Sequence, residues 1–305
     1  MIYTITLNPS IDYVVYLNSF SRGTVNRTVR DSFCIGGKGI NVSLILSELG
    51  IESSALGFTA GFTGEAIEKG LENRGIRADF VKAENGISRI NVKLKAEEDS
   101  EINGQGPLIS ERELGLFMKK TDIISDGDTV VIAGSIPKSL SENTYEKILE
   151  RLKNRKVHTV IDAEKNLLLN ALKYRPFLIK PNRQELSEIF GTEIKSYAEA
   201  EAYARRLQEM GAKNVIVSLD KDGAFMVDEF GKSHKSGIID EKIINTVGSG
   251  DSMIAGFLAG YQKTYDYGYA LTMGTACGNA TAFSDCLATR ETIEEAFRKL
   301  TFKPF

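Results

Sequence analysis

The chain has 305 residues, of which 42% are apolar and 26% are charged, and its net charge is −3. This composition is ordinary for a soluble globular protein, and the small negative charge gives no reason to expect nucleic acid or an acidic membrane as a partner. The N-terminus has the pattern of a strand rather than of a signal peptide, and no run of 18 apolar residues predicts a membrane span. We therefore expect a single α/β domain over residues 1–305, located in the cytoplasm.

The cysteine and histidine content narrows the classes of site to be expected. Cys34, Cys277 and Cys286 are odd in number and lack the spacing of metal ligands, so we expect free thiols in a reducing compartment. Only His158 and His234 could supply an imidazole, which argues against a histidine-based zinc site or a Ser-His-Asp triad.

Short β-branched runs alternate with amphipathic stretches along the chain. One such stretch, residues 196–211, has apolar side chains at helical spacing and ends at Gly211. This alternation predicts a mostly parallel central sheet with helices on both faces, and such sheets bind ligands at the carboxyl ends of their strands. The expected strands are residues 2–7, 129–134, 158–162, 177–182, 214–219 and 224–228.

The first expected strand leads into "LNPSIDY" (7–13), which contains Asp12. This places a carboxylate at the ligand-binding edge of the sheet, where it suits the vicinal hydroxyls of a sugar. The alternative is an Asp that caps the turn after Pro9, which is the commoner role for such a residue.

Two segments, 14–35 and 88–106, alternate polar and apolar residues, as half-exposed antiparallel strands do. We expect them to form a small sheet that projects from the main domain as a lid. Ordinary edge hairpins would produce the same pattern.

Between these segments lies "GGKGINV" (36–42), followed by an apolar helical pattern that ends near Gly50. Glycines at 36, 37 and 39 allow close approach of the backbone to a ligand, and a helix start presents free N–H groups to an anion. Lys38 adds a cation. The spacing matches neither a Walker A loop nor G-x-G-x-x-G, and a tight turn with a solvated lysine is an equal alternative.

Two later strand ends carry further candidates. Asn182 and Glu185 share one face of an expected helix, where they could hold Mg²⁺ through water or form a capping box, and the local sequence favours the cap. In "VSLDKDGAF" (217–225), Gly223 permits either a hairpin or a turn that contacts a nucleotide.

The stretch "VGSGDSMIAGF" (247–257) places Gly248, Ser249 and Gly250 directly before Asp251 and an apolar helix. Its backbone N–H groups could form an anion hole, and the positive end of the helix dipole favours an ionised Asp251. An ionised Asp can deprotonate a hydroxyl that attacks a phosphoryl group. A simple helix cap explains the same residues, and the local sequence does not separate the two.

Taken together and in this order, the motifs resemble the ribokinase-like sugar kinases of the phosphofructokinase B family, over the full length of the chain. The pairing of "GGKG" with "VGSGDS" carries the resemblance. The strings "TLNPSIDY", "SRINVK", "EINGQGP", "GSIPK" and "IKPN" are similar to the 1-phosphofructokinase branch, with the tagatose-6-phosphate kinase branch close behind. The resemblance implies ATP-dependent phosphorylation of fructose 1-phosphate at its C6 hydroxyl, with Mg²⁺. It also implies that the lid closes over the sugar and that a homodimer forms through it.

The resemblance assigns roles to the matched positions. Asp251 would be the catalytic base, and Gly248, Ser249 and Gly250 would form the anion hole. The implied sugar-phosphate ligands are Asp12, Arg27, Gly37, Lys38, Asn41, Arg89 and Ser135. The implied ATP-site residues are Lys180, Asn182, Ser218, Gly223 and Asn279, with Glu185 positioning Mg²⁺ through water.

Some positions depart from the family pattern. Asp220 stands where the family usually has Gly, and an added carboxylate near a nucleotide phosphate is unfavourable unless it points away. Residues 161–169 also differ from the usual string, and Asp285 and Cys286 replace an expected Glu and Gly. A catalytically silent sugar-phosphate sensor on the same fold is an alternative of another class, but the intact Asp251 argues against it. A Rossmann dehydrogenase is disfavoured because no G-x-G-x-x-G follows the first strand.

Overall fold

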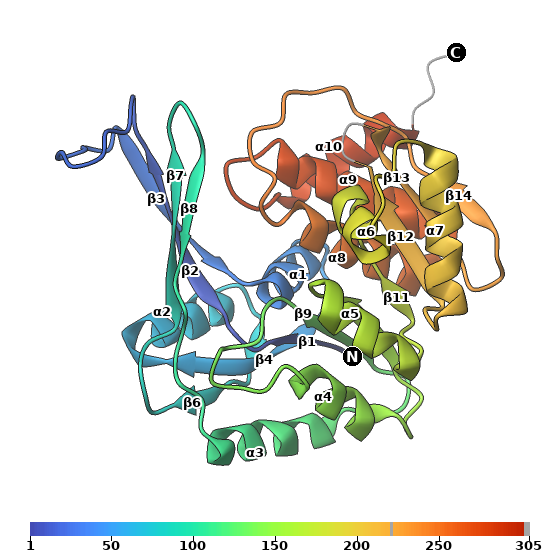
Figure 1. Ribbon diagram of the computed structural model, residues 1–305, viewed down its shortest axis with the longest axis horizontal. Helices are drawn as coiled ribbons and strands as arrows, with labels where there is room; N and C mark the ends of the chain where they lie inside the picture. The colour runs from blue at the N-terminus through green and yellow to red at the C-terminus, as the bar shows by residue number, and fades with distance from the viewer. Residues whose placement is uncertain (220–221, 302–305) are drawn as a thin grey trace.

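The computed structural model describes residues 1–219 and 222–301 and has two sheets of unequal size (Figure 1). The larger sheet follows the order β14-β13-β12-β11-β10-β9-β1-β4-β5, with β6 pairing with β4. All neighbours from β12 to β5 are paired in parallel, as are β4 and β6, whereas β13 and β14 are antiparallel strands at one edge. The strands are β1 (Ile2–Thr6), β4 (Ser53–Ala60), β5 (Arg77–Ala78), β6 (Val81–Ala83), β9 (Thr129–Ala133), β10 (His158–Asp162), β11 (Leu178–Ile179), β12 (Asn214–Ser218), β13 (Ala224–Val227) and β14 (Ser233–Lys235).

Helices cover both faces of this sheet because its strands carry apolar side chains on both sides. In β1, Ile5 packs in the core with α3 to α7, whereas Ile2 packs in the core with α1 and α8 to α10. A third core joins α1 and α2. The helices are α1 (Lys38–Glu48), α2 (Gly61–Glu72), α3 (Glu111–Lys120), α4 (Thr144–Leu152), α5 (Lys165–Ala171), α6 (Arg183–Phe190), α7 (Tyr197–Glu209), α8 (Ser249–Thr264), α9 (Tyr267–Ala282) and α10 (Arg290–Thr301), with 3₁₀ turns at Thr121–Ile123 and Leu172–Tyr174.

The expected α/β architecture is therefore confirmed, and the expected strands all occur. Helix α7 begins after Ser196, which caps it with Glu199 in a reciprocal capping box. Strand β4 is not among the strands expected from the sequence; it is buried along its whole length and lacks the alternation of a half-exposed strand. Of the helices in the described ranges, none has the length and apolarity that crossing a bilayer requires.

The smaller sheet, which we call the lid, projects from the main body (Figure 1). It has the order β3-β2-β7-β8 and consists of β2 (Ser10–Tyr16), β3 (Arg30–Gly36), β7 (Arg89–Lys95) and β8 (Ser100–Asn103). The expectation of antiparallel strands is only partly right, because the central pair β2–β7 is parallel. Both strands carry the chain outward from the body, and β3 and β8 bring it back.

The expectation of three free thiols is wrong for two of them. Cys34 in β3 and Cys286 in the loop after α9 form a disulfide, and Cys277 is free and buried in α9. The bonded cysteines are 252 residues apart in the sequence, so only the fold reveals that the lid strand lies against this loop.

Candidate active site

A cleft of about 480 Å³ lies between the lid and the carboxyl ends of the main strands. Ends of β1, β9, β10 and β11 supply one wall, the starts of α1 and α8 supply the floor, and β2, β7 and β8 supply the lid side. This is the edge at which ligands bind in parallel α/β sheets. Thr6 and Asn8 line it, and their side-chain oxygens Oγ1 and Oδ1 are buried with no hydrogen-bond partner within residues 1–219 and 222–301.

Asp251 occupies the first turn of α8 and is only 5% exposed. The side-chain amide of Asn41 in α1 donates a hydrogen bond of 2.7 Å to Asp251 Oδ2. Burial and then the negative charge of Asp162 raise the pKa of Asp251 to about 7, against the opposing effects of Lys38, Asn41 and Lys180. A carboxyl group with this pKa can take up a proton near neutral pH, as a general base must.

Lys38 begins α1, and its ammonium group lies 3.1 Å from Oδ1 of Asp162 at the end of β10. Burial alone would lower the pKa of Lys38, but the charges of Asp162, Asp251 and Glu185 raise it above its ordinary value. Burial likewise opposes ionisation of Asp162, yet Lys180 and Lys38 keep its pKa below the ordinary value. The lysine is therefore a fixed cation next to the candidate base.

The turn that precedes α8 has the geometry of an anion site. Gly248 has φ +80°, a conformation that favours glycine, and a Cβ atom there would lie 2.5 Å from the side chain of Leu287. A Cβ atom on Gly250 would lie 2.8 Å from Lys180 Nζ, so the ammonium group sits against the turn. Ser249 is the first residue of the helix, and first-turn N–H groups lack partners inside a helix. The turn thus offers N–H groups and a lysine to one anion.

The lid side presents polar groups to the same cleft. Asp12 Oδ1 accepts hydrogen bonds from Ser10 Oγ at 2.8 Å and from Asn91 Nδ2 at 2.7 Å. Burial lowers the pKa of Arg89 while Asp12 opposes this, and its Nε donates to the carbonyl oxygen of Asn8. Asp12 is therefore held in one orientation, with a cation beside it.

Asn182 and Glu185 form the capping box that their spacing predicts. Asn182 Oδ1 accepts from the Glu185 backbone at 2.7 Å, and Glu185 Oε2 accepts from the Asn182 backbone at 2.8 Å. Both residues also line the cleft, as does the buried Lys180. A cap and a place in the site are therefore compatible for these side chains.

The donor set of the cleft suits Mg²⁺ held through water. Besides Asp12 and Asp251, it contains the carboxylates of Asp162, Glu164 and Glu185, and oxygen is the ligand that Mg²⁺ prefers. In the described part of the chain, no three His, Cys, Asp or Glu side chains are close enough to bind a metal directly. Magnesium usually keeps several waters and binds phosphate oxygens as well, so this arrangement fits it.

Most of the site residues expected from sequence line this cleft. Ser249 lies between two of them, Gly248 and Gly250, at the start of α8, and the others lie elsewhere. The cleft is lined by Asp12, Gly37, Lys38, Asn41, Arg89, Ser135, Lys180, Asn182, Glu185, Gly248, Gly250 and Asp251. Ser218 bridges to Asn182, and Asn279 follows Gly278, which approaches the Ser249 carbonyl oxygen, so these two residues are near the cleft without lining it. Gly223 has φ +81° in the turn before β13 and does not line the cleft. Arg27 is exposed on the loop between β2 and β3 and does not line the cleft, so the structure does not support the interpretation that it faces the sugar phosphate in this conformation. Asp220 lies outside the described residues.

Sequence reasoning did not single out several further residues of the cleft, among them Asp162, Asn91 and Lys93. Asp162 ends a strand that was correctly expected, so the rule applied to Asp12 would have found it. Asn91 and Lys93 are two residues apart on β7, so their side chains lie on the same face of the lid. Only the pairing of β7 with β2 shows that this face lines the cleft.

Comparisons with known proteins agree with this geometry. A family model for "pfkB family carbohydrate kinase" matches residues 5–290. The 1-phosphofructokinase of Bacillus subtilis is 45% identical over 295 residues, covering 97% of each chain. The D-tagatose-1-phosphate kinase of Bacillus licheniformis is 37% identical over 286 residues, covering 93% of each. The crystal structure of Escherichia coli phosphofructokinase-2 in complex with substrates and products superposes with a TM-score of 0.92 at 26% identity, covering 99% of each chain. The chain belongs to the pfkB family of carbohydrate kinases.

Proposed function

We propose that this kinase transfers the γ-phosphoryl group of ATP to the C6 hydroxyl of fructose 1-phosphate, giving fructose 1,6-bisphosphate and ADP. One observation carries the proposal above the others. The buried carboxylate of Asp251, with a pKa of about 7, lies at the start of a helix whose preceding turn can hold an anion. A base and a phosphoryl site at one place are what transfer to an alcohol requires.

In the proposed reaction, Asp251 accepts the proton of the acceptor hydroxyl as its oxygen attacks the phosphorus atom. The hydrogen bond from Asn41 fixes the orientation of the carboxylate toward the cleft. The N–H groups of the turn at Gly248 to Gly250, together with Lys38, stabilise the negative charge on the transferring group. Because Asp162 holds Lys38 in place, little reorganisation is needed when this charge develops.

The sugar phosphate lies against the lid in this proposal. Asp12 accepts hydrogen bonds from sugar hydroxyls in this arrangement. Arg89 and Lys93 line the same side and would bind the phosphate that the sugar already carries. A phosphate dianion needs more than one cation, and Arg can bind it with two hydrogen bonds.

The nucleotide lies on the opposite side, at Lys180, Asn182, Ser218, Gly223 and Asn279. Mg²⁺ would be held by Glu185 through water, with the neighbouring carboxylates of the cleft, and would neutralise phosphate charge when bound. We propose that the whole chain acts as one catalytic domain with its lid, in the cytoplasm, where ATP is available.

We also propose that two copies pair through the lid. Phe33 and Ile102, on opposite edge strands β3 and β8, are 68% and 69% exposed. Apolar side chains of this size on a small sheet indicate a protein contact. Light scattering of the wild type and of Phe33→Glu tests this, because the charge should convert a dimer into a monomer.

The related D-tagatose-1-phosphate kinase supports a second candidate acceptor, D-tagatose 1-phosphate, which differs from fructose 1-phosphate only in the orientation of the C4 hydroxyl. Tagatose 6-phosphate is the third acceptor to compare, because the sequence motifs also resemble that branch.

Release of ADP should be measured with fructose 1-phosphate, fructose 6-phosphate, D-tagatose 1-phosphate and tagatose 6-phosphate. We expect the highest kcat/KM for fructose 1-phosphate and a loss of at least about 10²-fold in Asp251→Asn. Glu65→Gln, which removes an exposed carboxylate from α2, is the matched control. Turnover with none of the four sugars would refute a kinase of this class and favour the sensor, and equal rates in Asp251→Asn would refute the assigned base.

A further inference from the structure

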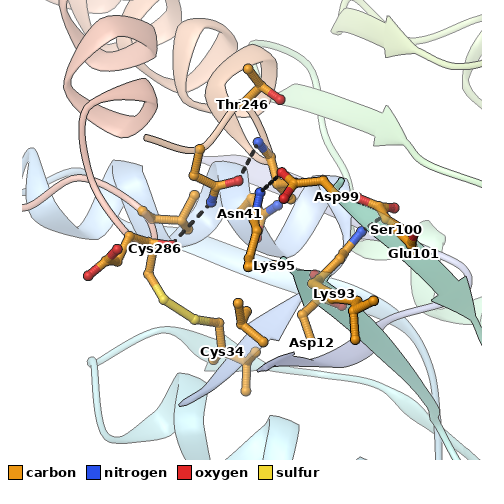
Figure 2. A pocket seen from close by; sticks show the side chains of 17 residues that line it. Asp12, Cys34, Asn41, Lys93, Lys95, Asp99, Ser100, Glu101, Thr246 and Cys286 are labelled. Atoms are coloured by element: carbon orange, nitrogen blue, oxygen red, sulfur yellow. Dashed lines mark hydrogen bonds and ion pairs between the residues drawn. A yellow bond between two sulfur atoms is a disulfide. The ribbon is translucent and has the colours of Figure 1, made fainter. Parts of the chain in front are cut away.

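The lid touches the main body at a second place, beside the cleft. There the disulfide joins Cys34 of β3 to Cys286, and the neighbouring Asp285 accepts hydrogen bonds from Arg30 at 3.1 and 3.2 Å and from the Tyr16 hydroxyl at 3.3 Å. Figure 2 shows the disulfide at the edge of a pocket that also contains Asn41 and Asp12. We call these five residues, Tyr16, Arg30, Cys34, Asp285 and Cys286, the latch.

Both ends of the latch lie next to catalytic groups. On the lid, Cys34 is paired directly across from Asp12 in the β2–β3 ladder. On the body, Cys286 precedes Leu287, whose side chain packs against Gly248 of the anion turn. A bond between the two cysteines therefore couples the position of the strand that carries Asp12 to the loop that packs against the anion turn.

The disulfide dominates this contact. The Arg30 and Asp285 side chains are 55% and 53% exposed, and ion pairs this exposed contribute little to stability. Once the disulfide is reduced, the remaining polar contacts would not hold the lid against the loop. Elsewhere the lid is joined to the body by the chain segments that lead into its strands and by Ile11 and Ile35, which pack against the third core.

The latch cysteines are also accessible, in contrast to the third. Cys34 and Cys286 are partly exposed, whereas Cys277 is fully buried and burial raises the pKa of its thiol to about 12. Exchange with a disulfide needs a thiolate that the reagent can reach, so the latch pair should react and Cys277 should not.

We propose that Cys34 and Cys286 form a reversible redox latch, in which the disulfide fixes the lid to the loop 283–289 and slows turnover, and the dithiol releases it. The effect on turnover rests on the kinase activity proposed above. The oxidant is a low-molecular-weight disulfide such as oxidised glutathione. One cysteine thiolate attacks the oxidised glutathione, forms a mixed disulfide and expels one glutathione thiolate. The second cysteine then attacks the mixed disulfide and expels the other glutathione thiolate. Two protein thiols are oxidised, one disulfide is reduced to two thiols, and the two thiol protons pass to the leaving thiolates. Slow lid opening limits product release in many enzymes, so fixing the lid should lower kcat.

The test equilibrates the full chain with reduced or oxidised glutathione, traps free thiols with N-ethylmaleimide and measures the Cys34–Cys286 peptide by mass spectrometry. The kcat for ATP and fructose 1-phosphate is measured on the same samples. We expect kcat to fall about tenfold or more in the oxidised protein and to recover with dithiothreitol. Cys34→Ser and Cys286→Ser should keep the reduced-state kcat in both buffers. Cys277→Ala, the matched control, should respond as the wild type does.

Two results would overturn the proposal: no Cys34–Cys286 disulfide in oxidised glutathione, or a complete disulfide with unchanged kcat. If the reduced enzyme phosphorylates none of the sugars, the proposed function fails instead. The latch is then tested by the rate of amide hydrogen exchange in β2 and β3. Oxidation should slow this exchange in the wild type but not in Cys34→Ser. Equal exchange in both states would refute the latch independently of activity.

Discussion

Replacing Asp251 with Asn should make the protein more stable while nearly abolishing its activity. Burial and the charge of Asp162 raise the pKa of Asp251 from 3.8 to about 7. The folded state therefore binds the proton more tightly than the unfolded state, and stability falls as the pH rises from about 4 to about 7. A shift of this size corresponds to about 4 kcal/mol lost at pH 8.

The Asn side chain removes this cost and retains an oxygen that can accept the hydrogen bond from Asn41. It also removes a negative charge that stabilises Lys38, so we expect a net gain in the free energy of unfolding of about 1–4 kcal/mol at pH 8. The gain should shrink as the pH falls toward 4, because the wild-type carboxyl is then protonated in the folded protein.

Urea denaturation followed by circular dichroism measures these free energies at several pH values. Glu65→Gln, on the exposed face of α2, controls for the loss of one carboxylate and should show neither the gain nor its pH dependence. If Asp251→Asn is less stable than the wild type at pH 8, or if its gain in stability does not change with pH, then ionised Asp251 does not destabilise the folded state as we infer.

Three further predictions concern the same cleft. The kcat/KM for fructose 1-phosphate should rise with pH and level off above about 7, because only ionised Asp251 accepts a proton, and a profile that is flat from about pH 5 to pH 9 would contradict this. Lys38→Met should lower kcat/KM by about 10² or more. If Asp162 acts by holding Lys38, the double variant Lys38→Met/Asp162→Asn should have nearly the same kcat/KM as Lys38→Met alone. Additive losses in steady-state kinetics would refute that role. Gly248→Ala should destabilise the protein and lower kcat more than Gly75→Ala does. Both glycines have positive φ, but of the two only Gly248 would place its new methyl group against another side chain. Equal losses of stability and of kcat in the two variants would contradict this reasoning.

The local sequence was sufficient to predict those structural features that lie within a single segment of the chain. The capping box of Asn182 and Glu185, the turn at Gly248 and the start of α1 after Gly37 all depend on residues within a few positions of one another. Such features follow from backbone geometry and hydrogen bonding within one stretch of chain.

Features that join distant segments could not be derived in this way. The contacts of Asn41 with Asp251, of Lys38 with Asp162 and of Cys34 with Cys286 span 210, 124 and 252 residues. Nothing in either segment of such a pair indicates its partner, because the pairing depends on how α1, β10, α8 and the lid strand β3 meet in the fold. The parallel pairing of β2 with β7 was missed for the same reason.

The most direct test of the account is the identity of the product. Fructose 1-phosphate labelled with ¹³C at C6 should be incubated with ATP, Mg²⁺ and the reduced enzyme, and the product examined by NMR. We predict coupling between the C6 carbon and a new phosphorus atom, with one ADP formed for each bisphosphate and neither product formed by Asp251→Asn. Phosphate on another carbon, or ADP formed with free phosphate and no bisphosphate, would contradict the proposed function.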